Sequence, residues 1–350
     1  MKAAAAPDAE DREAMLLAAV LAPSMHNTQP WRFRFDGFAV EVHRDRNREL
    51  PAEDPKRRML FVSLGAAIFN LRVGAAVRGY GARVRYLVDQ GRPDLVALVE
   101  LGEPERDGLA ALSPYLTLRR TNRQPFTDER IPDQARVELE LAARLESAQL
   151  QWLDRPSRRW WLHMATKDAV AVDGDSRRRT EERRRWVGGE RSVDGVPSSA
   201  LGPRNAGAGT VVRDMAASAP DSLRSTAVFE AEPQLAVLAT RFDGPIEWLR
   251  AGQAMERVLL EATRHGLATS LLNQVIEHAE LRWQINDPLG PWQRPQGVFR
   301  FGYGPPVPPT PRRPIADVVI HHETGPADAG QVEHGPGTLD SAPDNATSGV

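Results

Sequence analysis

Two stretches far apart in this sequence share a glycine spacing and a helical pattern of apolar residues. Residues 65–79 read GAAIFNLRVGAAVRG, and residues 252–266 read GQAMERVLLEATRHG. Both fit the 3.6-residue period of a helix with an apolar face. Similarity of this kind between two parts of a chain indicates a duplicated unit. The sequence therefore predicts two fused half-repeats, each containing one long helix.

The local patterns around these stretches are those of a mixed α+β protein. A helix is predicted over residues 8–21, where acidic residues stand in the first turn, and it ends at Pro23. Residues 31–44 alternate apolar and polar positions around the pair Asp36-Gly37, which predicts a β-hairpin. Further strands are expected at 83–88, 95–101, 150–153, 235–240 and 298–302, and further helices at 59–80, 133–147, 156–172, 245–265 and 277–285.

Composition narrows the classes of function. Lys and Arg number 45 against 47 Asp and Glu, and this balance argues against a nucleic-acid surface, which needs a basic surplus. The absence of cysteine excludes disulfides, thiol catalysis and Cys-ligated metals, and the eight histidines show no metal spacing. Acidic residues precede the apolar residues 14–22, unlike in a signal peptide, and no apolar run approaches the roughly 20 residues that span a bilayer. We expect a cytoplasmic protein without nucleic-acid, membrane or metal partners.

Two regions contain few large apolar side chains. Residues 174–225 are rich in Arg and then in Gly, Ser, Pro and Ala, and such a long stretch inside a domain is either a functional lid or disordered. Its first residues, 177–186, favour a solvated helix with i,i+4 charge pairs. After His322 the chain holds Gly, Pro, Ala, Ser and acidic residues without Lys or Arg. Residues 323–350 are therefore predicted to be a disordered tail.

Two polar segments carry the candidate chemistry. Residues 22–31 read APSMHNTQPW and lie between a predicted helix end and a predicted strand, where Ser, Asn and Pro also serve as ordinary caps and turns. Residues 119–123 read RRTNR. Their forked, always-charged guanidinium groups suit a phosphate monoester, but a solvated basic loop has the same composition. Taken singly, each segment leaves both interpretations open.

Together the two segments resemble the FMN-dependent nitroreductase family, and in particular its Acg-like members. The family combines an Arg-Arg-Ser-x-Arg-type motif, a Pro-Ser-x-x-Asn-x-Gln-Pro-Trp loop, a Gly-to-Gly-Leu helix and a late basic-basic-Pro stretch. This chain holds the loop in its first half, and it holds the other motifs at 119–123, 252–267 and 312–315 in its second half. The resemblance covers residues 8–320.

The resemblance implies a nitroreductase-like α+β fold in which two fused half-repeats form an intramolecular pseudo-dimer. The expected bounds are 8–110 for the first half and 111–322 for the second, with residues 174–225 as a lid-like insertion. Members of the family are usually homodimers with flavin at the subunit interface. A fused chain that keeps each motif once is therefore expected to retain one FMN site and to act as a monomer.

The resemblance also implies a set of cofactor-binding residues. Those expected around the FMN phosphate are Arg119, Arg120, Thr121, Arg123, Arg312 and Arg313. Those expected along the flavin ring are Pro23, Ser24, Met25, Asn27, Leu271, Leu272, Asn273 and Gln274. No catalytic side chain is expected, because the hydride chemistry belongs to the cofactor; His26 is expected to be a loop or pocket residue rather than a base.

The implied function is an FMN-dependent oxidoreductase that transfers hydride from NAD(P)H through FMN to a nitroaromatic or quinone-like acceptor. A flavin-binding protein that sequesters FMN beneath a lid, with little turnover, has the same motifs. A flavin-destroying or dehalogenating enzyme of the same fold is a third interpretation. The motifs alone do not separate the three.

Overall fold

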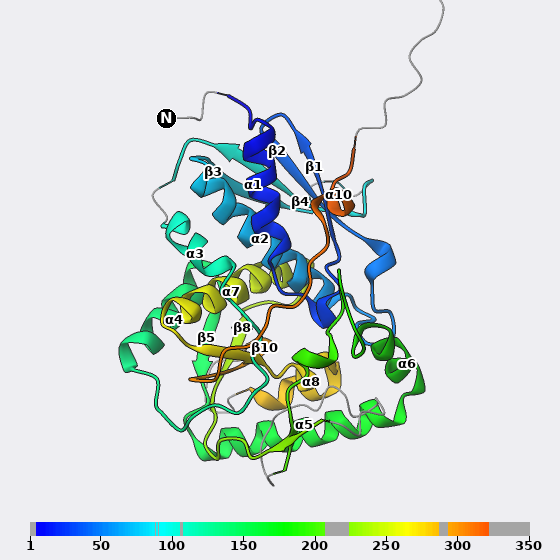
Figure 1. Cartoon of the computed structure of the whole chain (residues 1–350), viewed down its shortest axis with the longest axis vertical. Coiled ribbons are helices and arrows are strands. Elements are labelled where there is room, and N and C mark those ends of the chain that lie inside the picture. Colours follow the sequence, from blue (N-terminus) through cyan, green and yellow to red (C-terminus); the bar gives the residue numbers. More distant parts are fainter. Residues whose placement is uncertain are drawn as a thin grey trace, which may run out of the picture. The chain divides into compact units, whose positions relative to one another are not determined.

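Two four-stranded antiparallel sheets with the same strand order form the framework of the computed structural model (Figure 1). One has the order β1-β2-β4-β3 and the other β5-β8-β10-β9. Along the chain, each half runs through a helix, two strands, a long helix and two more strands. This repeated order confirms the prediction of two fused half-repeats. Buried apolar side chains from both halves also pack together in one shared core cluster.

The structure describes residues 5–87, 89, 91–105, 108–206, 224–286 and 293–321. The predicted tail, residues 207–223 of the predicted lid and residue 88 of a predicted strand lie outside them. Elements of the first half are α1 (Ala9–Val20), η1 (Met25–Asn27), β1 (Trp31–Asp36), β2 (Ala39–Arg44), η2 (Arg46–Arg48), α2 (Arg58–Val77), β3 (Gly81–Tyr86), β4 (Leu95–Gly102), η3 (Leu109–Leu112) and α3 (Ser113–Leu116).

The second half begins with α4 (Asp133–Leu145) and β5 (Gln149–Trp152). Its remaining elements are α5 (Pro156–Asp175), α6 (Arg177–Trp186), η4 (Ser198–Ala200), β6 (Arg204–Asn205), β7 (Thr226–Ala227), β8 (Gln234–Thr240), α7 (Pro245–Arg264), β9 (Ala268–Leu271), α8 (Gln274–Glu277), α9 (Ala279–Arg282), η5 (Trp283–Ile285), β10 (Arg294–Gly302) and α10 (Ile315–Val318).

The repeated glycines explain how the two long helices meet. Helices α2 and α7 cross in contact between the two sheets (Figure 1). A Cβ on Gly65 would lie 2.1 Å from the carbonyl oxygen of Leu249, and one on Gly252 would lie 2.0 Å from that of Val62. Only glycine permits this backbone approach. Contrary to the expectation that no apolar stretch approaches membrane-spanning length, helix α2 is apolar and long enough to span one, but 78% of that stretch is buried inside the protein, as in a core helix.

Each half also sends its last segment onto the other half. After β10, Val319 pairs with Phe33 of β1, and the N–H of Ile320 donates to the Phe33 carbonyl at 2.7 Å. After β4, Thr121 pairs with Thr269 of β9, and the N–H of Asn122 donates to the Thr269 carbonyl at 2.7 Å. The exchange carries the Arg-rich segment 119–123 to the edge of the second sheet.

The insertion is longer than the sequence pattern predicted. Strands β1 and β2 are joined by a two-residue turn, but their counterparts β5 and β8, which also pair directly, are separated by residues 153–233. Helix α5 belongs to this insertion. It packs Leu162, Ala165 and Ala169 into a separate apolar cluster, and such an apolar face has the same sequence pattern as that of a helix of the main core.

Candidate functional site

A cavity lies where the first-half loop after α1 meets the Arg-rich segment after α3. Its walls come from four parts of the chain: the loop, residues 116–124, residues 196–202 of the insertion and residues 307–312 after β10. Its lining includes Pro23, Ser24, Asn27, Arg119, Arg120, Thr121, Arg123 and Arg312. The loop and the Arg-rich segment follow helices of the first half, and the insertion and the segment after β10 belong to the second, so the fold assembles this cavity from both halves.

A second cavity adjoins the first and shares several of its lining residues, Thr121 and Arg123 among them. It extends between the long helices and the end of β9. Its walls include Pro23, Ser24, Met25, Met59, Ser63, Met255, Leu271, Leu272 and Asn273. The lining changes from strongly cationic in the first cavity to mixed in the second, where Met and Leu side chains stand among polar ones.

The loop over residues 23–29 has an unusual backbone. His26, Asn27 and Gln29 all have positive φ, at 48°, 56° and 51°, a region that non-glycine residues rarely occupy. Such strain persists only where the surroundings hold it, and it gathers at functional sites. Here the Gln29 N–H donates to Ser24 Oγ at 2.9 Å, and the Met25 N–H donates to Ser63 Oγ at 3.2 Å.

Asn27 fastens this loop to two other walls of the cavity. Its Nδ2 donates to the carbonyl oxygens of Gly195 and Pro311, at 2.9 and 3.0 Å, and its Oδ1 accepts from Arg312 Nη1 at 3.1 Å. One side chain therefore joins the loop, the insertion and the segment after β10.

Buried cations with unused donors line the first cavity. Arg119 and Arg312 are both largely buried, and Nε and Nη1 of Arg119 and Nε of Arg312 have no hydrogen-bond partner. Burial and the positive charge of Arg119 lower the pKa of Arg312 to about 9. The same two causes lower the pKa of Arg120. Buried donors without partners are costly, so this cluster is suited to an anion.

The insertion closes over this end of the site. Arg123 Nη1 donates to the carbonyl of Ala200 at 3.0 Å. Gly202, with φ of +72°, comes so close that an added Cβ would lie 2.3 Å from the Arg123 carbonyl oxygen. Farther along, Gln29 Nε2 donates to the Val193 carbonyl at 2.9 Å. Residues 193–202 thus form a cover, held by contacts with the loop and with the Arg-rich segment.

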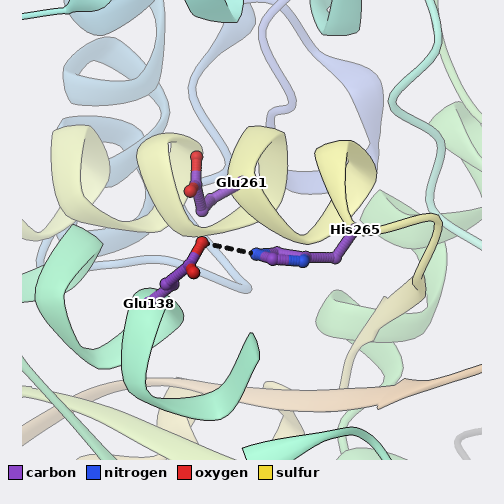
Figure 2. A group of neighbouring side chains, drawn as sticks. All are labelled: Glu138, Glu261 and His265. Carbon is purple, nitrogen blue, oxygen red and sulfur yellow. Dashed lines mark hydrogen bonds and ion pairs between the residues drawn. The ribbon is translucent and has the colours of Figure 1, made fainter. Parts of the chain in front are cut away.

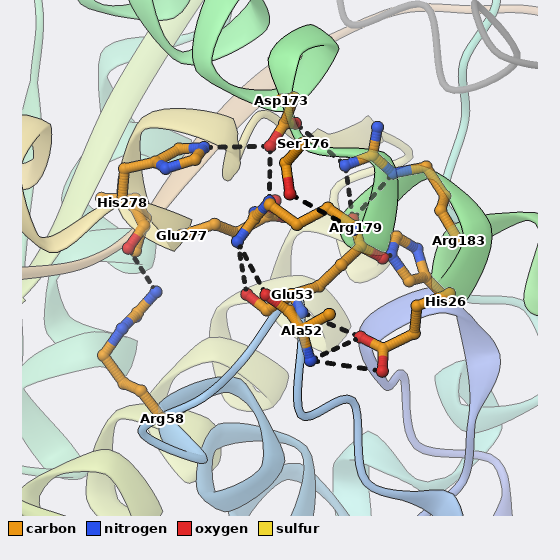
Figure 3. Close-up of polar contacts among 12 residues, drawn as sticks. His26, Ala52, Glu53, Arg58, Asp173, Ser176, Arg179, Arg183, Glu277 and His278 are labelled. Carbon is orange, nitrogen blue, oxygen red and sulfur yellow. Dashed lines mark hydrogen bonds and ion pairs between the residues drawn. The ribbon is translucent and has the colours of Figure 1, made fainter.

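A buried charge network anchors the helix that leads into this cover (Figure 3). Arg183 of α6 donates to Glu53 Oε1 at 2.8 Å and to Asp173 Oδ2 at 2.9 Å. Arg179 donates to Asp173 Oδ1 at 2.7 Å. Glu53, which is fully buried, also contacts His26 Nε2 at 2.5 Å. The network links the insertion to the cavity-lining loop through His26.

The predicted solvated helix at 177–186 is therefore only half solvated. Arg177 is exposed and pairs with Glu181 one turn later, as predicted. Arg179 and Arg183 are buried, contrary to that prediction, because acidic partners from distant parts of the chain compensate their charges.

Proteins of similar sequence show the family to which this chain belongs. No family model matches the sequence. A protein of Mycobacterium tuberculosis strain H37Rv with the name "Putative NAD(P)H nitroreductase" is 32% identical over 329 residues, which cover 89% of this chain and 92% of that protein. This chain belongs to the nitroreductase family. Another protein of that strain, named "Putative NAD(P)H nitroreductase acg", is 29% identical over 310 residues, 86% of this chain and 92% of its own length.

Two solved structures are also similar to parts of this nitroreductase-family chain. A nitroreductase with bound FMN from Bacteroides fragilis is 14% identical, with a TM-score of 0.34, and the match covers 64% of this chain and 98% of that one. A nitroreductase with bound FMN from Desulfitobacterium hafniense is 13% identical, with a TM-score of 0.38. The match covers 61% of this chain and 98% of that one. The family assignment rests on the sequence relatives.

Two of the residues expected from the resemblance lie outside the lining of both cavities. Arg313 points away: its Nη1 donates to the Gln29 carbonyl at 3.0 Å and its Nη2 to the Asp317 carbonyl at 2.6 Å. It supports the loop from behind. Gln274 is buried beside the second cavity without lining it. The other twelve expected residues line one cavity or both.

Several lining residues were not expected from the sequence. Met59 and Ser63 belong to α2, Met255 belongs to α7, and Glu277 ends α8. The first three stand in the repeated helices, where their apolar or small side chains fit a core pattern. The helix crossing directs them to the cavity, and the sequence contains no separate signal for this.

The counterpart of the loop in the second half is short and occupied by charges. Three residues, 146–148, join α4 to β5, where residues 21–30 join α1 to β1. Glu146 is buried and accepts from Arg72 Nη1 at 2.7 Å and from Arg257 Nη1 at 2.9 Å. In the second half, an ion-pair cluster therefore occupies the position that is equivalent to the cavity-lining loop of the first half.

Glu138, Glu261 and His265 form a group with metal-ligand chemistry (Figure 2). His265 Nε2 lies 2.9 Å from Glu138 Oε2. The guanidinium of Arg264 donates to both carboxylates. Because this cation already pairs with both acids, the group is interpreted as a surface ion-pair cluster between α4 and α7.

Proposed function

We propose that this chain is an FMN-dependent oxidoreductase that takes hydride from NAD(P)H and passes it to a small acceptor of the nitroaromatic or quinone type. The observation that carries the proposal is the pair of buried guanidinium groups, Arg119 and Arg312, whose unused donors line a cavity built from both halves. The names of the mycobacterial relatives support NAD(P)H as the donor.

The cationic cavity is suited to the phosphate end of the cofactor. A phosphate monoester presents three acceptor oxygens and a charge near −2. Guanidinium donors bind such a group through charge-assisted hydrogen bonds. The residues proposed to hold it are Arg119, Arg120, Thr121, Arg123 and Arg312.

The adjoining cavity, whose lining combines Met and Leu side chains with polar ones, is suited to the flat ring. Pro23, Ser24, Met25 and Asn27 would line the ring from the first half, and Leu271, Leu272 and Asn273 from the second. When bound, FMN supplies the hydride acceptor and donor. The chain's own residues bind and orient the cofactor, and the cover limits the access of water and substrates.

A second candidate function is sequestration of FMN with little turnover. The cover favours it, because residues 196–202 line the cavity and a buried charge network anchors the helix before them. A donor that reacts only with an open state has an apparent affinity reduced in proportion to the open fraction.

Steady-state kinetics separates the two candidates. The FMN-loaded protein is mixed with NADH or NADPH, and nucleotide oxidation is followed with and without a nitroaromatic or a quinone. In the absence of oxygen, which can itself reoxidise reduced flavin, a reductase oxidises the nucleotide many times per flavin only when the acceptor is present. Oxidation that stays below one turnover per flavin with every acceptor would support sequestration and overturn the proposed reductase.

A further inference from the structure

Glu256 is a buried carboxylate that the proposed function does not use. It stands on α7, is fully buried, and neither of its oxygens has a hydrogen-bond partner. An isolated carboxylate in such a place is strongly disfavoured unless a cation compensates it. Glu256 therefore requires a cation close by.

The compensating charges are those of the cationic cavity. Arg119 Nε lies 3.5 Å from Glu256 Oε1, an ion-pair distance that is too long for a good hydrogen bond. Arg312 acts on the same carboxylate from the segment after β10, and uncharged Asn70 faces it from α2. Glu256 is thus the acidic member of a cluster otherwise made of Arg119, Arg120 and Arg312.

A phosphate in the cavity would compete with this carboxylate. Both are anions that attract the same guanidinium groups, and like charges close together disfavour ionisation of one of them. The carboxylate offsets the mutual repulsion of the arginines in the absence of a ligand. Once a phosphate compensates the arginines, the charge on Glu256 becomes unfavourable.

We propose that Glu256 is an internal counter-ion of the phosphate site and takes up a proton when the phosphate of a flavin nucleotide binds. This inference rests on the proposed function, because FMN supplies the phosphate. It makes the affinity for the cofactor depend on pH through a group that need not touch the cofactor.

The electrostatics of the site agree with this role. Burial raises the pKa of Glu256 to about 7, against the opposing effect of Arg119 and Arg312. A bound phosphate would raise it further. Proton uptake then occurs between the two pKa values, and FMN binding weakens by up to about tenfold per pH unit above the lower one. The phosphate's own second ionisation, with a pKa of roughly 6, acts in the opposite direction at lower pH.

The test measures the FMN dissociation constant from pH 6 to 9 for wild type and for Glu256→Gln, which keeps the side-chain volume and removes the charge. Wild type should bind FMN most tightly near neutral pH and then lose about tenfold by pH 8.5. Glu256→Gln should stay level above pH 7 and bind more tightly than wild type at pH 8.5. Parallel pH profiles, or weaker binding by the variant at every pH, would show a purely structural residue and overturn the inference.

Calorimetry of wild type in two buffers with different ionisation enthalpies gives a second readout that needs no variant. At pH 8, FMN binding should take up a proton, and riboflavin, which lacks the phosphate, should take up none. No uptake with FMN would contradict the role of Glu256 but leave the FMN site intact. Failure of FMN to bind at all would instead refute the proposed function, and this inference with it.

Discussion

The two joints between the first helix and the first strand of each half differ in length and in the side chains that they hold. In the first half, residues 21–30 form a strained loop that lines the cavity. In the second half, three residues suffice, and Glu146 fills the space with ion pairs to Arg72 and Arg257. The two equivalent positions therefore differ: one lines the cavity proposed to bind FMN, and the other is occupied by ion pairs.

The same asymmetry holds for the hairpins. The first-half hairpin turns within two residues, whereas the second-half hairpin contains the whole insertion, whose residues 193–202 reach back to cover the first-half loop. The half that lost the loop thus supplies the cover for the half that kept it.

The largest expected effect comes from loosening the cover. Arg183→Ala leaves Glu53 and Asp173 buried with one cation fewer, and breaking a buried pair costs roughly 3–5 kcal/mol. We expect faster proteolysis within residues 187–202, faster FMN release and faster flavin reduction by NAD(P)H. Limited proteolysis and stopped-flow absorbance measure these effects.

The matched control is Arg178→Ala, one residue from Arg179 on the exposed face of α6. It should change none of the three rates. Equal behaviour of Arg183→Ala and wild type would mean that residues 193–202 cover the cavity without the help of the charge network.

Disrupting the helix crossing should affect both halves alike. Gly252→Ala forces a Cβ against the Val62 carbonyl, and overpacking of this kind costs roughly 1–3 kcal/mol. The free energy of unfolding, measured in urea, should fall by that amount in a single transition, because one core spans the two halves. Gly174→Ala, in α5 with open space around it, should be neutral or slightly stabilising. Separate unfolding transitions for the two halves would contradict a shared core.

One arginine from the cavity and one from the equivalent position around Glu146 allow a direct comparison of the two positions by mutation. Arg120→Ala removes a cation from the cavity and should weaken FMN binding by about 10- to 100-fold, the worth of a charge-assisted hydrogen bond. Arg72→Ala removes a cation from the filled position and should lower stability without changing FMN affinity. Fluorescence titration and urea unfolding of both variants measure this contrast. A loss of affinity in Arg72→Ala equal to that in Arg120→Ala would erase the distinction between the positions.

The sequence predicted the repeat because both glycines of each stretch have a structural role: Gly65 and Gly252 permit the backbone contact between α2 and α7, and Gly79 and Gly266 take a positive φ just after each helix. It also predicted the hairpin around Gly37, whose φ of +55° suits glycine. Strand β9 was missed, because the four residues Ala-Thr-Ser-Leu have neither the length nor the alternation of a typical strand.

The residues of the two cavities could be predicted where they belong to a local sequence motif. They could not be predicted where the residues that they contact come from distant segments. The run of arginines on α6 has the composition of a solvated surface, and only the fold brings Glu53 and Asp173 to it. Glu256 stands in a helix with several other charged residues, so nothing in its neighbourhood along the chain marks it as buried.

The most direct test of this account is the number of FMN molecules that one chain binds. Flavin-free protein of known concentration is titrated with FMN, and the end point is read from flavin fluorescence and calorimetry. One cavity completed by both halves, with its counterpart filled by Glu146, Arg72 and Arg257, predicts one FMN per chain. Two FMN per chain would show that the second position also binds the cofactor and would contradict the account.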